Sequence, residues 1–193
     1  FMHSKYVQSS TVGIFKHVRD KITLGKKVLF VGLPCQVEGL YSYLGNLCNS
    51  DLLWTIDLVC FGIPSNKLFH KYLAENYDVS NIRDIVFRDK KAGEGWSPTG
   101  YGIYLNDGSE HYPNGDDEYQ SAFHGVIFRN KVCEKCNRFQ IPRIGDFTLG
   151  DFWGIQLHDP TWNDGKGTSL ISVNSLKGYK LFEEIKNDFA RIE

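Results

Sequence analysis

Two short, continuous apolar runs constrain the fold of this chain more than any other feature of its sequence. The runs are KVLFVG at 27–32 and LLWTIDLVC at 52–60, and such runs are typical of strands buried on both faces. Stretches with apolar residues at helical spacing stand around them, at 11–25, 36–45 and 66–77. Alternating helix and strand signals indicate a parallel sheet, and we expect the three helices to cover it.

The pattern becomes rich in β signals from residue 82. IRDIVFRDK at 82–90 reads as a strand, and two further runs meet at Asn-Asp-Gly, 106–108, which is a hairpin signal. A strand at 169–174 and a helix after it return to the first pattern. We therefore predict an α/β fold with a mixed, largely parallel sheet flanked by helices. A β-rich insertion is expected around 82–120.

Length, charge and cysteine content exclude several classes of protein. The chain has 193 residues, which suits one domain over 1–193, and it begins at Phe1, so we expect a fragment of a longer chain. A net charge of −1 without a Lys/Arg run does not indicate nucleic-acid binding. No apolar stretch approaches the roughly 20 residues of a membrane helix. Five cysteines, an odd number in a chain too large to need disulfides, indicate a reducing compartment, the cytoplasm.

The cysteines fall at positions that suggest a shared site. Cys35 follows the first apolar run and Cys60 ends the second, so both stand at the carboxyl end of a predicted strand. Neighbouring parallel strands lie roughly 5 Å apart, and open α/β sheets bind ligands at this edge. Cys133 and Cys136 form a C-x-x-C pair that a loop could bring to the same place. Cys48 has no partner at useful spacing, and we interpret it as an ordinary thiol.

Four thiolates suit either an iron–sulfur cluster or structural zinc. Soft sulfur ligands alone do not choose between the two. Structural zinc sites usually draw on two closely spaced ligand pairs, and only one pair is local here. The strand-end positions are where α/β enzymes place active sites. This context favours the cluster, and a four-cysteine zinc domain that serves as a non-redox interaction module remains the alternative.

Six motifs taken together resemble one known family. They are SKYVQS (4–9), GKKVLFVGLPCQVEGL (25–40), DLVCFGIPS (57–65), RNKVCEKCNRF (129–139), GDFTLGDFWGI (145–155) and GKGTSLISVNSLKG (165–178). In this order they resemble the C-terminal domain of the coenzyme F420 hydrogenase/dehydrogenase beta-subunit family. The resemblance implies a single iron–sulfur and flavin oxidoreductase domain. Such a domain would pass electrons between a 4Fe-4S cluster, FAD and a deazaflavin or another redox partner.

The resemblance also implies partners and roles for particular residues. Coenzyme F420 is a candidate substrate, and a redox partner protein, a ferredoxin-like domain or a small-molecule electron acceptor would complete the electron path. The cluster ligands would be Cys35, Cys60, Cys133 and Cys136. The residues expected near the flavin are Lys5, Gln8, Ser9, Gly32, Pro34 and Gln36.

The motif GDFTLGDFWGI allows two interpretations. In the first, a core strand ends in a turn; in the second, Asp151 or Trp153 forms part of the wall of the cofactor cavity. The chain also departs from the family at two places. Phe61 stands where a histidine is frequent after the second cysteine, and Leu33 stands where a threonine is common. The chain therefore lacks the imidazole and the hydroxyl that relatives offer there.

Overall fold

The structure is a computed structural model, and it describes residues 9–89, 91, 100–113, 117–138, 140–162 and 165–188. The chain divides into two compact units, each described by itself below. Unit 1 consists of Ser9 and the described residues within Gly62–Lys135 and Asp159–Gly167. Unit 2 consists of the described residues within Ser10–Phe61, Cys136–His158 and Thr168–Glu193. None of the helices in the described ranges has the length and apolarity needed to cross a membrane.

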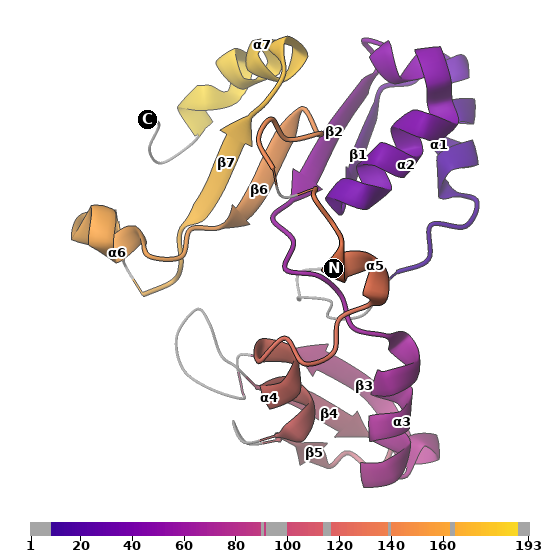
Figure 1. The fold of residues 1–193 in the computed structure, drawn as a ribbon, viewed down its shortest axis with the longest axis vertical. Helices are drawn as coiled ribbons and strands as arrows, with labels where there is room; N and C mark the ends of the chain where they lie inside the picture. The colour runs from indigo at the N-terminus through magenta and orange to yellow at the C-terminus, as the bar shows by residue number, and fades with distance from the viewer. Residues whose placement is uncertain are drawn as a thin grey trace. The chain divides into compact units, whose positions relative to one another are not determined.

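Unit 2 is built on a sheet in the order β1-β2-β6-β7 (Figure 1). Strands β1, β2 and β6 run parallel, and β7 is antiparallel to β6, which confirms the predicted mixed, largely parallel sheet. The elements are α1 (Ile14–Thr23), β1 (Val28–Gly32), α2 (Pro34–Leu44), β2 (Leu53–Leu58), β6 (Phe147–Asp151), α6 (Ile155–His158), β7 (Ser169–Val173) and α7 (Leu176–Ile185), with 3-10 turns at Gly45–Asn49 and Lys186–Asp188.

The apolar core of unit 2 lies where α1 and α2 pack beside β1 and β2 (Figure 1). Val18 and Ile22 from α1 and Val37 and Leu40 from α2 gather against Phe30 of β1, and all five side chains are buried. Full burial of a side chain of this size contributes roughly 1.5–3 kcal/mol. This core holds the amino-terminal end of α2, and with it Cys35, beside the sheet.

Unit 1 contains a separate antiparallel sheet in the order β3-β4-β5. The predicted hairpin at 106–108 joins β4 to β5, where Gly108 adopts a left-handed φ of 89° that glycine accepts without steric cost. The β-rich segment predicted around 82–120 is therefore confirmed. The elements are α3 (Asn66–Asn76), β3 (Ile82–Phe87), β4 (Tyr101–Leu105), β5 (Glu110–His111), α4 (Glu118–His124) and α5 (Lys131–Glu134), with 3-10 turns at Val79–Asn81 and Pro160–Trp162.

Helix α3 differs from the expectation in the sheet that it covers. We expected it to cover the parallel sheet, but its buried residues Phe69 and Leu73 pack with Phe87 and Tyr101 of the antiparallel sheet. Phe69 and Phe87 have ring centroids 5.3 Å apart. Helical spacing shows which side of a helix is buried, but it carries no information on which core receives that side. The prediction was correct for the helix and wrong for its packing partner.

Candidate metal centre

Cys35 and Cys60 leave the same edge of the parallel sheet of unit 2. In the register of β1 and β2, Gly32 pairs with Asp57, and the two cysteines each stand three positions further along the chain. Cys35 is exposed in the first turn of α2, and Cys60 is half-buried just after β2. The predicted placement at equivalent strand ends is confirmed, while the role of the two thiols as metal ligands stays a prediction.

The turn between β1 and α2 has a structural reason for each of its residues. Pro34 occupies the first turn of α2, where a missing N–H costs nothing. The Gln36 side-chain Oε1 accepts a hydrogen bond of 2.8 Å from the Leu33 N–H, so Gln36 stabilises this turn, where Leu33 has no hydroxyl. A Cβ at Gly32 would come within 2.9 Å of the Phe30 ring. Gly32, Pro34 and Gln36 therefore shape the loop that carries Cys35, and their proximity to a flavin stays a prediction.

Cys136 begins a loop that is tied to helix α2. The backbone N–H of Arg138 donates to the Cys136 Sγ at 3.5 Å, a contact that suits a thiolate because hydrogen bonds to sulfur stabilise its negative charge. The Arg138 guanidinium in turn lies 2.6 Å from the Glu38 carboxylate. Glu38 follows Cys35 by one turn on α2. The loop of Cys136 is thus held against the helix that begins with Cys35.

Arg143 ties the same loop to the end of β2. Its Nη2 lies 2.6 Å from the Asp57 carboxylate and donates to the Leu58 carbonyl at 3.1 Å, while its Nη1 donates to the Arg138 carbonyl at 3.0 Å. The side chain is only 10% exposed and that of Asp57 is fully buried. Cys60 lies two residues beyond Leu58, so this ion pair fixes the Cys136 loop beside the strand end that carries Cys60.

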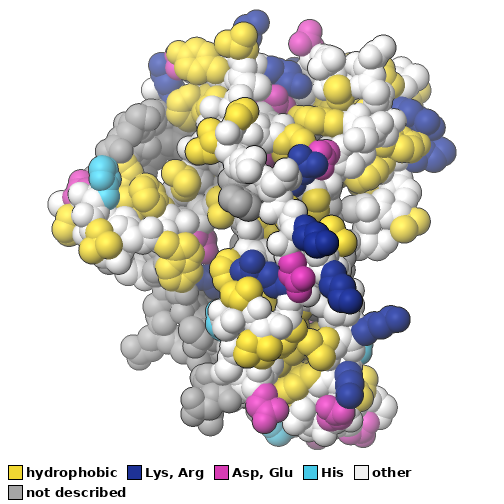
Figure 2. Space-filling view, in the orientation of Figure 1, with side chains coloured by type: hydrophobic (Ala, Val, Ile, Leu, Met, Phe, Trp, Pro, Cys, Tyr) yellow, Lys and Arg dark blue, Asp and Glu magenta, His cyan; other side chains and the backbone are white. Residues whose placement is uncertain are grey.

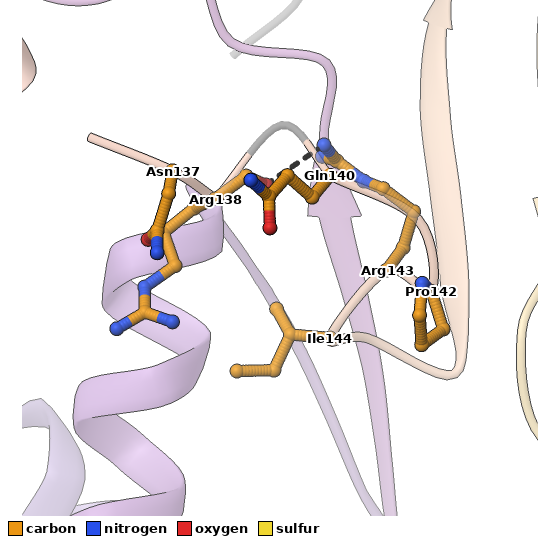
Figure 3. A pocket seen from close by; sticks show the side chains of 6 residues that line it. All are labelled: Asn137, Arg138, Gln140, Pro142, Arg143 and Ile144. Carbon is orange, nitrogen blue, oxygen red and sulfur yellow. Dashed lines mark hydrogen bonds between the residues drawn. The ribbon is translucent and has the colours of Figure 1, made fainter.

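A pocket of about 410 Å³ lies inside this loop. Figure 3 shows the Arg143 side chain reaching across the loop to the backbone of Arg138. The residues that line the pocket offer two amide and two guanidinium groups, together with the apolar side chains of Pro142 and Ile144. The lining residues are Asn137, Arg138, Gln140, Pro142, Arg143 and Ile144. The loop that follows Cys136 therefore has a largely polar lining, in which both guanidinium groups are paired with carboxylates.

A second buried carboxylate, Asp146, supports the sheet one strand further along. It accepts hydrogen bonds from the Thr55 N–H at 2.9 Å and from the Ser175 hydroxyl at 2.6 Å, and the Lys177 ammonium lies 3.5 Å away. The Thr55 hydroxyl also bonds the Tyr41 hydroxyl of α2 at 2.5 Å, and burial raises the pKa of Tyr41. The carboxylates Asp57 and Asp146 thus tie β2 to β6, α2 and α7.

Cys133 belongs to unit 1, whereas Cys35, Cys60 and Cys136 belong to unit 2. Cys133 is half-buried in the short helix α5. The Asn130 side chain accepts from the Val132 N–H at 3.2 Å and so caps this helix, and the Asn130 N–H donates to the Ile63 carbonyl at 2.9 Å. Cys133 is therefore anchored to the residues that directly follow Cys60 and Phe61 in the chain.

No disulfide joins any of the five cysteines, all of which lie in the described ranges. Among the described residues, no group of three or more His, Cys, Asp or Glu side chains stands in a metal-holding arrangement. Cys48 packs against the apolar core of unit 2, as expected of an ordinary thiol. The donor set, four cysteines, has the chemistry of a thiolate-bound metal centre; three of them, Cys35, Cys60 and Cys136, stand on segments of unit 2 that named contacts join, and their role as ligands stays a prediction.

The remaining predicted flavin contacts have separate outcomes. Lys5 and Gln8 lie outside the described residues, and Ser9 is exposed. Asp151 is the exposed last residue of β6, and Trp153 is 66% exposed in the turn that follows. This matches the interpretation of a strand that ends in a turn. A flavin contact by Asp151 or Trp153 stays a prediction.

Sequence reasoning did not single out Asp57, Arg143 or Thr148. The Thr148 hydroxyl donates to Asp57 at 2.9 Å and thereby completes the buried cluster. A signal was present, because Asp57 interrupts an apolar run that predicts a buried strand, and a buried carboxylate requires a partner. The partner itself, 86 positions away, has no signal in the sequence.

Comparison with protein families gives one match. The family model that describes the C terminus of the beta subunit of coenzyme F420 hydrogenase/dehydrogenase matches residues 25–192. The matched range contains all four candidate ligands and most of both units, and it begins after α1. No curated protein matches the chain.

Proposed function

This chain belongs to the coenzyme F420 hydrogenase/dehydrogenase beta-subunit family, and from this premise we propose that it is an iron–sulfur flavoprotein oxidoreductase subunit. It would pass electrons between a 4Fe-4S cluster, FAD and a deazaflavin or another redox partner. The observation that carries the proposal is the matched placement of Cys35 and Cys60 at one sheet edge. The loop of Cys136 is bonded to the elements that carry both of them.

We assign the four ligand positions to Cys35, Cys60, Cys133 and Cys136. Arg138 and Arg143 stand in the Cys136 loop, where each is paired with a carboxylate, Glu38 and Asp57 respectively, and so connects the loop to its neighbours. The backbone N–H of Arg138 is a donor to one of these sulfurs. The residues assigned to the flavin are those given by the family motifs, namely Lys5, Gln8, Ser9, Gly32, Pro34, Gln36, Asp151 and Trp153.

The two cofactors supply complementary electron chemistry when they are bound, since a flavin takes up a hydride as an electron pair and a cluster accepts single electrons. The chain's own contribution is positioning. The Gln36 contact with Leu33 and the lack of a side chain at Gly32 let the backbone of the Cys35 loop turn closely. On this proposal no side chain acts as a nucleophile, and residues 1–193 form one functional domain to which both units contribute.

The partner in this proposal is an acidic electron-carrier protein or a ferredoxin-like domain in the cytoplasm. Helix α5, which carries Cys133, presents exposed Lys131 and Val132, and exposed Lys135 follows it. Figure 2 shows further Lys and Arg side chains, in dark blue, interspersed with Asp and Glu side chains, in magenta, on one face of the molecule. Electrostatic attraction of this kind chiefly raises the rate of association with a negatively charged partner.

Anaerobic purification with metal and flavin quantitation tests the proposal. We expect about four iron and about four sulfide per chain, with FAD bound and a brown colour. Replacing any of the four assigned cysteines with alanine should remove most of the iron. Cys48→Ala is the matched control and should retain it, because Cys48 packs in the apolar core. A colourless protein with one zinc and no iron would instead support the non-redox zinc domain.

A further inference from the structure

The Arg143 guanidinium bonds two backbone carbonyls, each of which lies two residues along the chain from a candidate ligand. Its Nη1 donates to the carbonyl of Arg138, two residues after Cys136. Its Nη2 donates to the carbonyl of Leu58, two residues before Cys60. One side chain therefore spans the two segments that carry two of the assigned thiols, and both segments belong to unit 2.

The ion pair with Asp57 fixes the orientation of this guanidinium. The Asp57 Oδ1 accepts from Nη2 at 2.6 Å and from Nε at 3.2 Å, and the Thr148 hydroxyl donates to the same oxygen at 2.9 Å. The other carboxylate oxygen accepts from the Gly145 N–H at 2.8 Å. Asp57 is fully buried, so its charge has no access to water. Arg143 thus has a single well-defined orientation.

The buried pair has little net charge to offer to a metal centre. Its effect on such a centre is therefore geometric, through the distance between the Leu58 and Arg138 carbonyls. A lysine could keep the ion pair with Asp57, but one ammonium nitrogen would replace two nitrogen atoms that point to different carbonyls. Arginine and lysine are not interchangeable at sites of this kind.

We propose that Arg143 is a positioning residue for the metal centre. By bonding the Leu58 and Arg138 carbonyls at once, it sets the spacing between Cys60 and Cys136, and metal affinity depends on that spacing. The inference rests on the proposed assignment of these two cysteines as ligands. It does not rest on which metal centre they hold.

Cobalt titration of the metal-free, reduced full chain tests this role without using catalytic activity. Co²⁺ bound by thiolates gives intense visible and near-ultraviolet bands that report ligand type and geometry, and competition with a chelator gives the affinity. We expect Arg143→Lys to bind Co²⁺ roughly 10- to 100-fold more weakly than the wild type, with altered bands, because loss of an outer-shell partner has effects of this size. Circular dichroism checks that the variant is folded.

Arg19→Lys is the matched control, because Arg19 also belongs to unit 2 but lies on α1, where its side chain is 43% exposed beside Asp20. Its affinity for Co²⁺ should stay within about threefold of the wild type, below the range expected for an outer-shell partner. If Arg143→Lys does not fold, the double variant Asp57→Asn with Arg143→Gln replaces the charged pair by neutral amides and should show the same weakening. The inference is overturned if a folded Arg143 variant has the same affinity for Co²⁺ and the same thiolate–cobalt bands as the wild type.

The wild-type protein separates this inference from the proposed function. Suppose the wild type binds Co²⁺ through thiolates but never assembles iron and sulfide, and Arg143→Lys binds Co²⁺ more weakly. This result supports the positioning role and rejects the redox function. Wild-type protein without any thiolate–cobalt bands rejects the ligand assignment and the inference with it.

Discussion

Replacing Asp57 with asparagine should destabilise unit 2 more than the same substitution does at an exposed aspartate of that unit. The Asp57 Oδ1 accepts from Arg143 and from the Thr148 hydroxyl, and Oδ2 accepts from the Gly145 N–H. An asparagine has one acceptor oxygen and one NH₂ group. Whichever way its amide turns, the NH₂ faces a donor, so one buried donor loses its partner.

The size of the effect follows from burial. The Arg143 side chain is only 10% exposed and the side chain at 57 is fully buried, so water does not compensate the guanidinium charge that remains when the Asp57 charge is removed. Breaking a buried pair by removing one charge costs about 3–5 kcal/mol. Arg143 keeps its bonds to the Leu58 and Arg138 carbonyls, which places the expected loss near the lower limit, about 3 kcal/mol. For a chain of this length that lowers the melting temperature by roughly 6–12 °C.

Urea titration gives the free energy of unfolding, and peptide-resolved hydrogen exchange shows which unit has lost stability. Amides of β2 and β6 should exchange faster in Asp57→Asn, while amides of β4 in unit 1 should not change. Asp20→Asn is the control, since Asp20 pairs with Lys16 at 2.7 Å on an exposed helix surface, where such pairs contribute little. The reasoning is refuted if Asp57→Asn loses less than about 1 kcal/mol, the value of one ordinary hydrogen bond.

Three further predictions concern unit 1, its partner surface and its pH response. Val126 follows the C-cap of α4 with a left-handed φ of 61°, so Val126→Gly should raise the free energy of unfolding by about 1 kcal/mol in a urea titration. The Tyr119 hydroxyl is buried without a partner among the described residues, and burial raises its pKa to about 12. Tyr119→Phe should therefore add about 1 kcal/mol at pH 7. Its advantage should grow above pH 10, because the unfolded tyrosine loses its proton there while the folded one keeps it; equal pH profiles would contradict this. Lys131→Glu combined with Lys135→Glu should slow association with an acidic redox partner roughly tenfold at low salt, whereas Lys180→Glu, exposed on α7, should not.

Local sequence patterns predicted what depends on local interactions. The continuous apolar runs at 27–32 and 52–60 located β1 and β2, and parallel pairing then placed Cys35 and Cys60 at one edge. The Asn-Asp-Gly signal located the β4–β5 hairpin in the same way. These predictions succeeded because backbone conformation and alternation of burial are set within a few residues.

Contacts between distant segments had no such signal. The bond from Arg143 to Asp57 joins residues 86 positions apart, and neither residue belongs to a recognisable pair in the sequence. Helix α3 was predicted correctly, yet its core residues Phe69 and Leu73 pack with Phe87 and Tyr101 and not with the parallel sheet. Hydrophobic spacing specifies that a side is buried, whereas the choice between two cores depends on shape complementarity that a single sequence does not display.

The two buried carboxylates of unit 2 separate stability from positioning. The core around Phe30 and Leu40 is apolar, whereas Asp57 is paired with Arg143 of the loop that follows Cys136, and Asp146 bonds Thr55 of β2 and Ser175 before α7. Well-packed apolar side chains of similar volume are often at least as stabilising as a buried ion pair. What an ion pair with several hydrogen bonds adds is a defined orientation, which apolar contacts do not enforce to the same degree. On the proposed ligand assignment, the thiolates must be held at fixed distances, and the ion pair of Arg143 with Asp57 would serve that need for geometry rather than a need for stability.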